Sequence, residues 1–130
     1  MGAPVEVVAV VIVEGDRVLI QRRREGDALV DWWEFPGGKR KAGESWQQAA
    51  VREVREELGI DIAAGDILAM AEHQRDERTL LLAFVAGQRL GGEPEAREGQ
   101  EVVWAALDAL DGYPMPAPNQ AVLATLARQS

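Results

Sequence analysis

The feature that most constrains the fold of this chain is a helix whose two ends are both specified by the sequence. Ser45 has a side chain suited to an N-cap, and Gln48, three residues later, completes a capping box. Gly59 supplies the left-handed residue at which a helix ends. The apolar positions at helical spacing are Trp46, Ala50, Val51, Val54 and Leu58. The sequence therefore predicts an amphipathic helix over 45–58 that packs one face on the rest of the fold.

Strand-like runs surround this helix. The predicted strands are Val5–Val13, Arg17–Gln21, Trp33–Phe35, Ile67–Gln74, Arg78–Val85 and Glu101–Ala106. Turn residues at Glu14-Gly15-Asp16 and at Asp76-Glu77 predict two hairpins. The other predicted segments are loops at Gly26–Asp31, Pro36–Gly38 and Gly91–Gly99, a helical turn at Leu107–Asp111 and a terminal helix at Asn119–Arg128. This order, without βαβ alternation, predicts an α+β fold with a mixed sheet between helices, in a single domain spanning 1–130.

The composition limits the chemistry of such a domain. The 130-residue chain has no cysteine and one histidine, His73, which excludes thiolate sites and zinc sites built on several histidines. A metal must therefore be held by oxygen ligands, as Mg²⁺, Mn²⁺ and Ca²⁺ are. The net charge of −8 disfavours binding to long nucleic acids. A small phosphorylated molecule is compatible with this charge if cations neutralise it.

Nothing in the sequence is typical of a targeting signal. The apolar run Val7–Val13 is too short to cross a bilayer and lacks a basic leader. Met1-Gly2 is followed by Glu6 where a myristoylation signal requires Ser or Thr. We therefore expect a cytoplasmic protein with no membrane partner.

Three carboxylates share one face of the predicted helix. Glu53, Glu56 and Glu57 stand at i, i+3 and i+4, a spacing at which like charges repel each other. One interpretation is a solvated acidic face, with Arg52 and Arg55 as partners. The other is that the carboxylates converge on hard divalent cations, which tolerate clustered negative charge.

Two flanking features favour the second interpretation. Pro36-Gly37-Gly38 predicts a tight turn with exposed backbone, where a carbonyl can join a ligand set. Arg52 follows Glu44 at a distance that suits pairing with it, which would hold the preceding loop on the helix. The segment 37–60 is therefore the candidate metal-binding region.

The same segment resembles the signature of the Nudix hydrolase family. Its pattern is Gly38-x5-Glu44-x7-Arg52-Glu53-Val54-x-Glu56-Glu57-x-Gly59-Ile60, which agrees with that signature at every specified position. Further segments similar to the MutT-like 8-oxo-dGTP diphosphatases of this family are Trp33–Lys39, Glu98–Gln100 ahead of Trp104, and Pro118-Asn119. The resemblance runs from about Val5 to Leu126. It implies the Nudix fold, an α/β/α sandwich with a mixed β-sheet and a catalytic loop-helix-loop.

The resemblance also implies a ligand set for catalytic Mg²⁺, for which Mn²⁺ can substitute. Glu56 and Glu57 are the implied primary ligands, and the Gly37 carbonyl completes the site. Glu53 is implied to be a further ligand or to orient the attacking water.

Other roles outside this ligand set follow from the same resemblance. Glu98, in a loop beyond the signature, is implied to be another metal ligand or a general base, with Glu101 as the nearby alternative. The implied structural residues are Gly38, Glu44, Arg52 and Gly59.

The nucleotide-binding candidates come from the resemblance as well. Arg23, within the basic triplet 22–24, matches a phosphate-contacting arginine, and Lys39 is a second cation near the metal loop. Asn119 matches the residue that reads the purine edge, where an amide donates and accepts at once. Arg78 matches a position bordering the base pocket. The full candidate set is Arg23, Glu34, Phe35, Pro36, Gly37, Lys39, Arg78 and Asn119.

The chain departs from the MutT-like pattern at two positions that bear on base preference. Arg75 stands where those enzymes place an aromatic residue near the base, and Ala28 stands where they carry a histidine. The aromatic residues that could stack on the base instead are Trp32, Trp33, Phe35, Phe84 and Tyr113. Strand Trp and Phe residues are more often part of the core. His73 is expected to be a strand histidine without a catalytic role.

The expected function is that of a Mg²⁺-dependent nucleoside triphosphate pyrophosphohydrolase, which releases a nucleoside monophosphate and pyrophosphate. The expected substrate is 8-oxo-dGTP or a related (d)NTP, in sanitation of the nucleotide pool and hence DNA repair. Alternative substrates within the family are CTP, modified pyrimidine triphosphates and ADP-ribose. A catalytically silent nucleotide-binding domain is disfavoured because every glutamate of the signature is present. The chain is expected to act as a monomer or homodimer.

Overall fold

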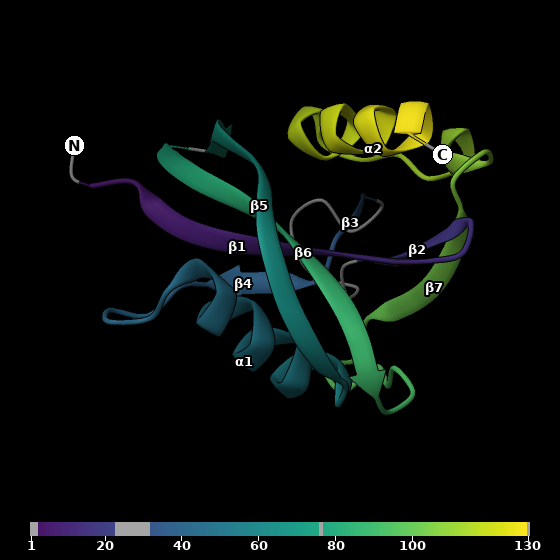
Figure 1. The fold of residues 1–130 in the computed structure, drawn as a ribbon. Helices are drawn as coiled ribbons and strands as arrows, with labels where there is room; N and C mark the ends of the chain where they lie inside the picture. Colours follow the sequence, from purple (N-terminus) through teal and green to yellow (C-terminus); the bar gives the residue numbers. More distant parts are fainter. Residues whose placement is uncertain (1–2, 23–31, 76, 130) are drawn as a thin grey trace.

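The computed structural model describes residues 3–22, 32–75 and 77–129 of the chain (Figure 1). Its elements are β1 (Val5–Glu14), β2 (Arg17–Arg22), β3 (Trp33–Glu34), β4 (Gly37–Lys39), α1 (Trp46–Leu58), β5 (Asp61–Arg75), β6 (Arg78–Gly91), β7 (Glu101–Ala106), the 3₁₀ turn η1 (Leu110–Gly112) and α2 (Ala117–Gln129). In Figure 1 the strands form a central layer, with α1 on one side of it and α2 on the other. The predicted α/β/α sandwich is confirmed.

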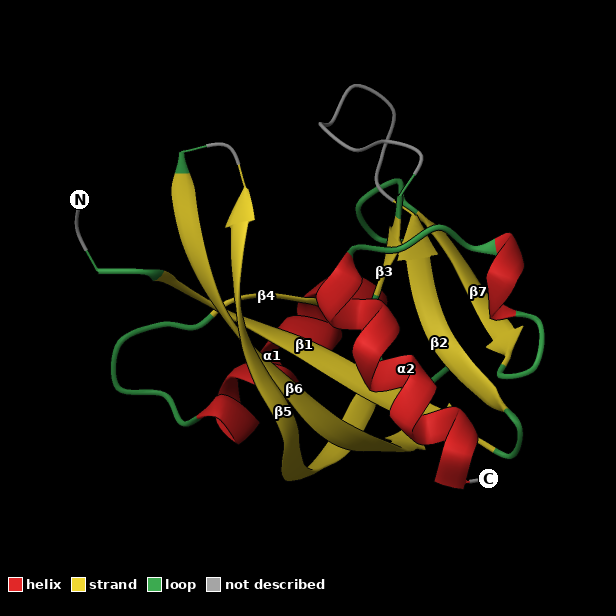
Figure 2. Ribbon diagram, turned by 90° about the horizontal axis from the view of Figure 1, so that it is seen from above, coloured by secondary structure: helices red, strands yellow, loops and turns green. Residues whose placement is uncertain are grey.

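The sheet is mixed, as predicted. The strands follow the order β3-β2-β1-β6-β5, while β4 pairs with β1 and β7 pairs with β2. β1 runs parallel to β6, whereas the other pairs are antiparallel. Both predicted hairpins are confirmed, and Gly15 adopts a φ of 62° in the turn between β1 and β2, where a left-handed residue suits the hairpin. In Figure 2 the long β5–β6 hairpin lies at the left of the view, and β2 and β7 lie at the right.

Two hydrophobic cores lie on the two faces of the sheet, because successive residues of β1 point in opposite directions. Val8, Val10 and Ile12 are fully buried on the face that packs against Val54 and Leu58 of α1. The alternate residues Ala9 and Val11 belong to the core that contains Val122 and Leu123 of α2. Each fully buried Val, Leu or Ile side chain contributes roughly 1.5–3 kcal/mol, so β1 contributes to the packing of both helices.

Helix α1 begins and ends as the sequence predicts. The Ser45 hydroxyl accepts a hydrogen bond from the Gln48 backbone N–H at 3.0 Å, and the Gln48 side chain accepts one from the Ser45 N–H at 2.8 Å. Gly59 is left-handed, with a φ of 70°, and its N–H donates to the Arg55 carbonyl. The fixed ends define the helix, and burial of its apolar residues Val54 and Leu58 against the sheet determines its rotation and hence which way its glutamates point.

The predicted turn at Pro36–Gly38 is wrong in its second half, because Gly37 and Gly38 belong to strand β4. Gly38 pairs with Val8 of β1 in an antiparallel register. A Cβ on Gly37 would lie 1.9 Å from the Val8 carbonyl oxygen. The missing side chain therefore lets the segment lie against β1 as a strand instead of turning away.

Three other elements differ from the prediction by at least three residues at one end. β5 begins at Asp61 and not at Ile67, and the pairing of β5 with β6 shifts register between Ala64 and Ile67 and again between Ile67 and Ala69. Such irregularities interrupt the alternation on which strand prediction depends. β6 continues to Gly91, and the helical turn lies at Leu110–Gly112. The predicted loop at 26–31 lies outside the described residues.

Neither helix in the described ranges has the length and apolar character needed to cross a membrane.

Candidate active site

A cavity of about 640 Å³ lies where α1, the loop after β6 and the start of α2 approach the sheet. The sequence-predicted residues that line it are Glu34, Phe35, Gly37, Gly38, Lys39, Glu57, Arg78, Glu98 and Asn119. These residues come from positions 34 to 119, so the fold gathers most of the predicted site in one place. The predicted residues Pro36, Glu53 and Glu56 are not part of the lining.

Glu57 is the carboxylate that the fold holds most firmly at this cavity. It is 6% exposed, and both of its oxygens accept hydrogen bonds. Oε1 accepts from the Gly37 backbone N–H at 2.8 Å, and Oε2 accepts from Gln21 Nε2 at 3.1 Å. Burial raises the pKa of Glu57 to about 8, against the two hydrogen bonds that lower it. A carboxylate buried in this way favours a cation beside it, because a cation offsets the loss of hydration.

Glu53 lies one helical turn before Glu57, against strand β4. A Cβ on Gly38 would lie 2.4 Å from its Oε2, so a glycine at this position lets the carboxylate approach the strand. Burial raises the pKa of Glu53, and the neighbouring guanidinium of Arg52 opposes that shift. Glu56 is more exposed, at 54% of its side chain, and faces Arg52 instead of the cavity.

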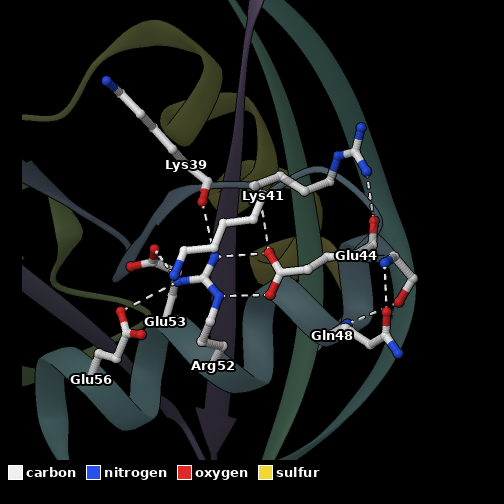
Figure 3. A network of polar contacts seen from close by, with 9 residues as sticks. Lys39, Lys41, Glu44, Gln48, Arg52, Glu53 and Glu56 are labelled. Carbon is white, nitrogen blue, oxygen red and sulfur yellow. Dashed lines mark hydrogen bonds and ion pairs between the residues drawn. The ribbon is translucent and has the colours of Figure 1, made fainter.

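Arg52 is the centre of a network of ion pairs, shown in Figure 3. Its guanidinium binds both oxygens of Glu44, at 2.6 and 2.9 Å, and it also contacts Glu53 at 2.9 Å and Glu56 at 3.3 Å. A further N–H donates to the Lys39 carbonyl at 3.0 Å. The predicted pairing of Arg52 with Glu44 is thus present, and it lowers the pKa of Glu44 to about 2. The loop before α1 is therefore fastened to the helix that carries the acidic residues.

The donor set fits a hard cation, although the acidic side chains are not gathered into a ready-made cage. Within residues 3–22, 32–75 and 77–129, no three acidic or histidine side chains converge closely enough to hold a metal. Glu57 is nevertheless buried and Glu53 half-buried beside the backbone of β4, and both offer the carboxylate oxygens that a hard cation prefers. The resemblance implies that the Gly37 carbonyl is a metal ligand. In the structure, the N–H of the same residue donates to the Glu57 carboxylate.

The structure distinguishes the two glutamates, Glu98 and Glu101, that the sequence left as alternatives. Glu98 lines the cavity, whereas Glu101 does not and instead pairs with Arg22. Glu98 belongs to a loop that is tied to the end of α1 through the Arg97 N–H, which donates to the Glu57 carbonyl at 3.2 Å. This geometry favours Glu98 as the carboxylate that works together with Glu57.

The cavity lining also includes apolar residues and three further polar side chains. Phe35 packs edge-on against Phe84, with ring centroids 5.9 Å apart, and lines the cavity, while Phe84 itself is fully buried. The three polar residues are Arg78, Asn119 and His73. Apolar walls with a few polar groups are typical of pockets for a nucleobase.

The other stacking candidates lie away from the cavity wall. Trp33 is buried and packs edge-on against Tyr113, with centroids 5.0 Å apart. Trp32 is 38% exposed and outside the lining. The predictions for Arg23, Arg24 and Ala28 fall outside the described residues, as does the side chain of Arg75.

Three polar lining residues were not among the predicted site residues. Gln21 and Gln100 are both buried, at 7% exposure each, and His73 lies on β5 as predicted but borders the cavity. A glutamine directly after the apolar run 18–20 is the signal that could have singled out Gln21, because buried polar side chains need partners.

The raised pKa of Glu57 predicts that the metal-free protein loses stability as the pH rises. A carboxyl that holds its proton more tightly in the fold stabilises it fully below its ordinary value of 4.5, and this contribution is lost as the pH rises through about 8. We expect the free energy of unfolding, measured with urea in the presence of a chelator, to fall by a few kcal/mol over this range. The free energy of unfolding of Glu57→Gln should depend less on pH. An equal pH dependence in the two proteins would contradict the raised pKa of Glu57.

Comparison with known proteins gives consistent matches over nearly the whole chain. The family model described as the NUDIX domain matches residues 3–126. The 8-oxo-dGTP diphosphatase of Escherichia coli (strain K12) is 35% identical over 121 residues, which are 93% of this chain and 94% of that protein. The CTP pyrophosphohydrolase of the same organism is 34% identical over 111 residues, or 85% of this chain and 82% of that protein. The solved structure of the MutT protein from Methanosarcina mazei Go1 has a TM-score of 0.85 at 26% identity, covering 99% of this chain and 97% of that one.

Proposed function

The chain belongs to the NUDIX domain family, and from that membership we propose that it hydrolyses a nucleoside triphosphate to a nucleoside monophosphate and pyrophosphate. The observation that carries this proposal is the buried Glu57 carboxylate at the edge of a cavity large enough for a nucleotide. Hydrolysis adds a water oxygen to the α- or the β-phosphorus while the bridging P–O bond between them breaks, which separates the nucleoside monophosphate from pyrophosphate. We further propose that residues 1–130 act as one domain.

The proposed cofactor is Mg²⁺, with Mn²⁺ as a substitute, held by the carboxylates of Glu57, Glu53 and Glu56. Divalent metal dependence agrees with the family and with an all-oxygen donor set. When bound, such a cation neutralises phosphate oxygens and lowers the pKa of a bound water. Glu56 would have to turn from Arg52 to join the ligands, and its exposure leaves room for that rotation.

Four further residues of the chain are proposed to take part in the reaction or to orient Glu57. Glu98, in the loop beside Glu57, is proposed as a further ligand or as the base that takes the proton of the attacking water. Lys39 is an exposed cation at the cavity and is proposed to contact a phosphate. The Gly37 N–H and the Gln21 amide orient the Glu57 carboxylate through its two oxygens.

The proposed substrate is 8-oxo-dGTP or a related (d)NTP. Asn119 supports this choice, since it is buried, lines the cavity and carries an amide that can both donate and accept on an oxidised purine edge. CTP is the second candidate, because the relatives at 35% and 34% identity include one enzyme of each name. The net charge of −8 supports a small nucleotide as partner instead of a long nucleic acid.

A nucleotide screen tests the proposed activity. Canonical, oxidised and methylated triphosphates and ADP-ribose would each be incubated with the protein and Mg²⁺, and release of pyrophosphate and of phosphate would be followed separately. We expect pyrophosphate from at least one triphosphate and no turnover in the presence of a chelator. A protein inert toward every compound offered, or one that releases only phosphate, would rule out the proposed reaction.

Replacing Asn119 by alanine tests the base-reading role. A site that loses a buried amide partner discriminates less well between bases, and each lost hydrogen bond is worth about 1 kcal/mol. We expect the preference for 8-oxo-dGTP over dGTP, measured as the ratio of kcat/KM values, to fall about fivefold to tenfold. Equal ratios in variant and wild type would remove Asn119 from base recognition.

A further inference from the structure

A continuous chain of hydrogen bonds connects Glu98 to Glu57 through two buried glutamines. The Glu98 backbone N–H donates to Gln100 Oε1 at 2.9 Å. Gln100 Nε2 lies 3.4 Å from both Gln21 Oε1 and the Glu57 carbonyl oxygen. Gln21 Nε2 then donates to Glu57 Oε2 at 3.1 Å. The links run in one direction, so each amide presents its NH₂ group toward the helix and its oxygen away from it.

Both glutamines are placed where an amide must have partners. Gln21 lies in β2 between β3 and β7, and Gln100 directly precedes β7. Each is 7% exposed, and a buried amide without a hydrogen bond is costly. Because the oxygen of Gln21 accepts from Gln100, its NH₂ group is left to donate to the carboxylate. The orientation of one amide therefore fixes that of the next.

Backbone contacts hold the ends of this chain together. The loop between β6 and β7 lies on the last turn of α1, where the Glu95 N–H donates to the Leu58 carbonyl at 2.9 Å and the Arg97 N–H donates to the Glu57 carbonyl at 3.2 Å. The carbonyl of Glu57 thus receives two donors from the segment that carries Glu98. The position of that segment and the orientation of the Glu57 side chain are therefore linked.

We propose that Gln21 and Gln100 are positioning residues, which hold the Glu57 carboxylate and the Glu98 loop in one fixed relation. The proposal rests on the proposed function for the roles of Glu57 and Glu98, but the coupling itself is a property of the fold. The side chains of both glutamines are hydrogen-bonded to Glu57, to the Glu98 backbone and to each other. Their effect is transmitted through the two glutamates.

The coupling is tested without catalysis by amide hydrogen exchange, measured by NMR on the metal-free protein. Gln21→Met removes the amide without touching Glu98. We expect the Glu98 amide to exchange at least about fivefold faster relative to the Gly99 amide, which donates to Ala96 in the same loop. Gln47→Met is the matched control, because it also removes a 3.1 Å side-chain bond, to the Gly65 carbonyl, but lies outside the chain. An unchanged ratio of the Glu98 and Gly99 exchange rates in Gln21→Met would overturn the proposal.

A second variant covers the case in which Gln21→Met does not fold. Gln21→Asn keeps an amide that is one methylene shorter and so cannot reach both partners. It should give the same selective acceleration at Glu98. A folded Gln21→Asn protein with the wild-type exchange ratio overturns the proposal in the same way.

Steady-state kinetics adds a readout that lost stability alone would not change. With the best nucleotide and saturating Mg²⁺, Gln21→Met and Gln100→Met should each lower kcat about tenfold with KM within about twofold, as expected when a side chain that orients a metal-binding carboxylate is lost. The double variant should be no slower than the slower single variant, since both act through one chain. Multiplicative effects would overturn the proposal. A wild type that hydrolyses nothing would reject the proposed function, while the exchange ratio would still decide the coupling.

Discussion

Glu57→Gln is expected to lower kcat by at least about a hundredfold while leaving the metal-free protein at least as stable as the wild type at neutral pH. The fold already holds Glu57 with a pKa of about 8, so a neutral side chain of the same shape resembles the protonated acid. A divalent cation needs the ionised carboxylate, which glutamine cannot supply. The loss should exceed the 10–100-fold that is typical when a supporting residue of a metal site is replaced.

Thermal unfolding with and without Mg²⁺ separates this outcome from simple misfolding. Mg²⁺ at a hundredfold excess over its Kd should stabilise the wild type by about 2.7 kcal/mol, and most of that shift should be absent in Glu57→Gln. Glu72→Gln is the matched control, because Glu72 is an exposed carboxylate on β5 that does not line the cavity. A Glu57→Gln variant that retains both the Mg²⁺ shift and turnover would show that the metal is held elsewhere.

The parts of this site that sequence reasoning predicted well are those fixed by local chemistry. The limits of α1 follow from Ser45, Gln48 and Gly59, each of which acts on its own neighbours in the chain. The pairing of Arg52 with Glu44 was predicted in the same way, from their positions on either side of the helix start. The spacing of Glu53 and Glu57 at i and i+4 then places both carboxylates on one face of the helix.

The parts that it missed depend on contacts between distant segments. β4 exists because the missing side chain of Gly37 lets it lie beside the Val8 carbonyl, which no local pattern reveals. The burial of Glu57 was not expected either, since its helix face was predicted as either solvated or metal-bound. Gln21 and Gln100 become partners only when β2 and the loop before β7 meet the end of α1. Periodicity predicts elements, whereas such long-range contacts decide which side chains share a cavity.

Arg52→Met is expected to be the most destabilising replacement of a charged residue on α1. Arg52 contacts Glu44, Glu53 and Glu56 together, and its side chain is 20% exposed. Its removal leaves carboxylates that are partly buried and close together without their cation, and losing one partner of a buried ion pair costs about 3–5 kcal/mol. Because solvent reaches part of this network, we expect a loss of about 2–3 kcal/mol in the free energy of unfolding at pH 7, measured with urea.

Arg55→Met provides the control from the next turn of the same helix. Arg55 is 63% exposed and pairs only with Asp61 among the described residues, so its replacement should change stability by less than about 1 kcal/mol.

The pH dependence of the free energy of unfolding adds a second check. Arg52 lowers the pKa of Glu44 to about 2, so the stability from this pair is present above the ordinary value of 4.5 and is lost as the pH falls through 2. The difference in the free energy of unfolding between wild type and Arg52→Met should therefore become smaller in acid. If instead the two arginine variants were equally stable at pH 7, the network around Arg52 would be a surface feature, and the loop before α1 would have to be held by β4 alone.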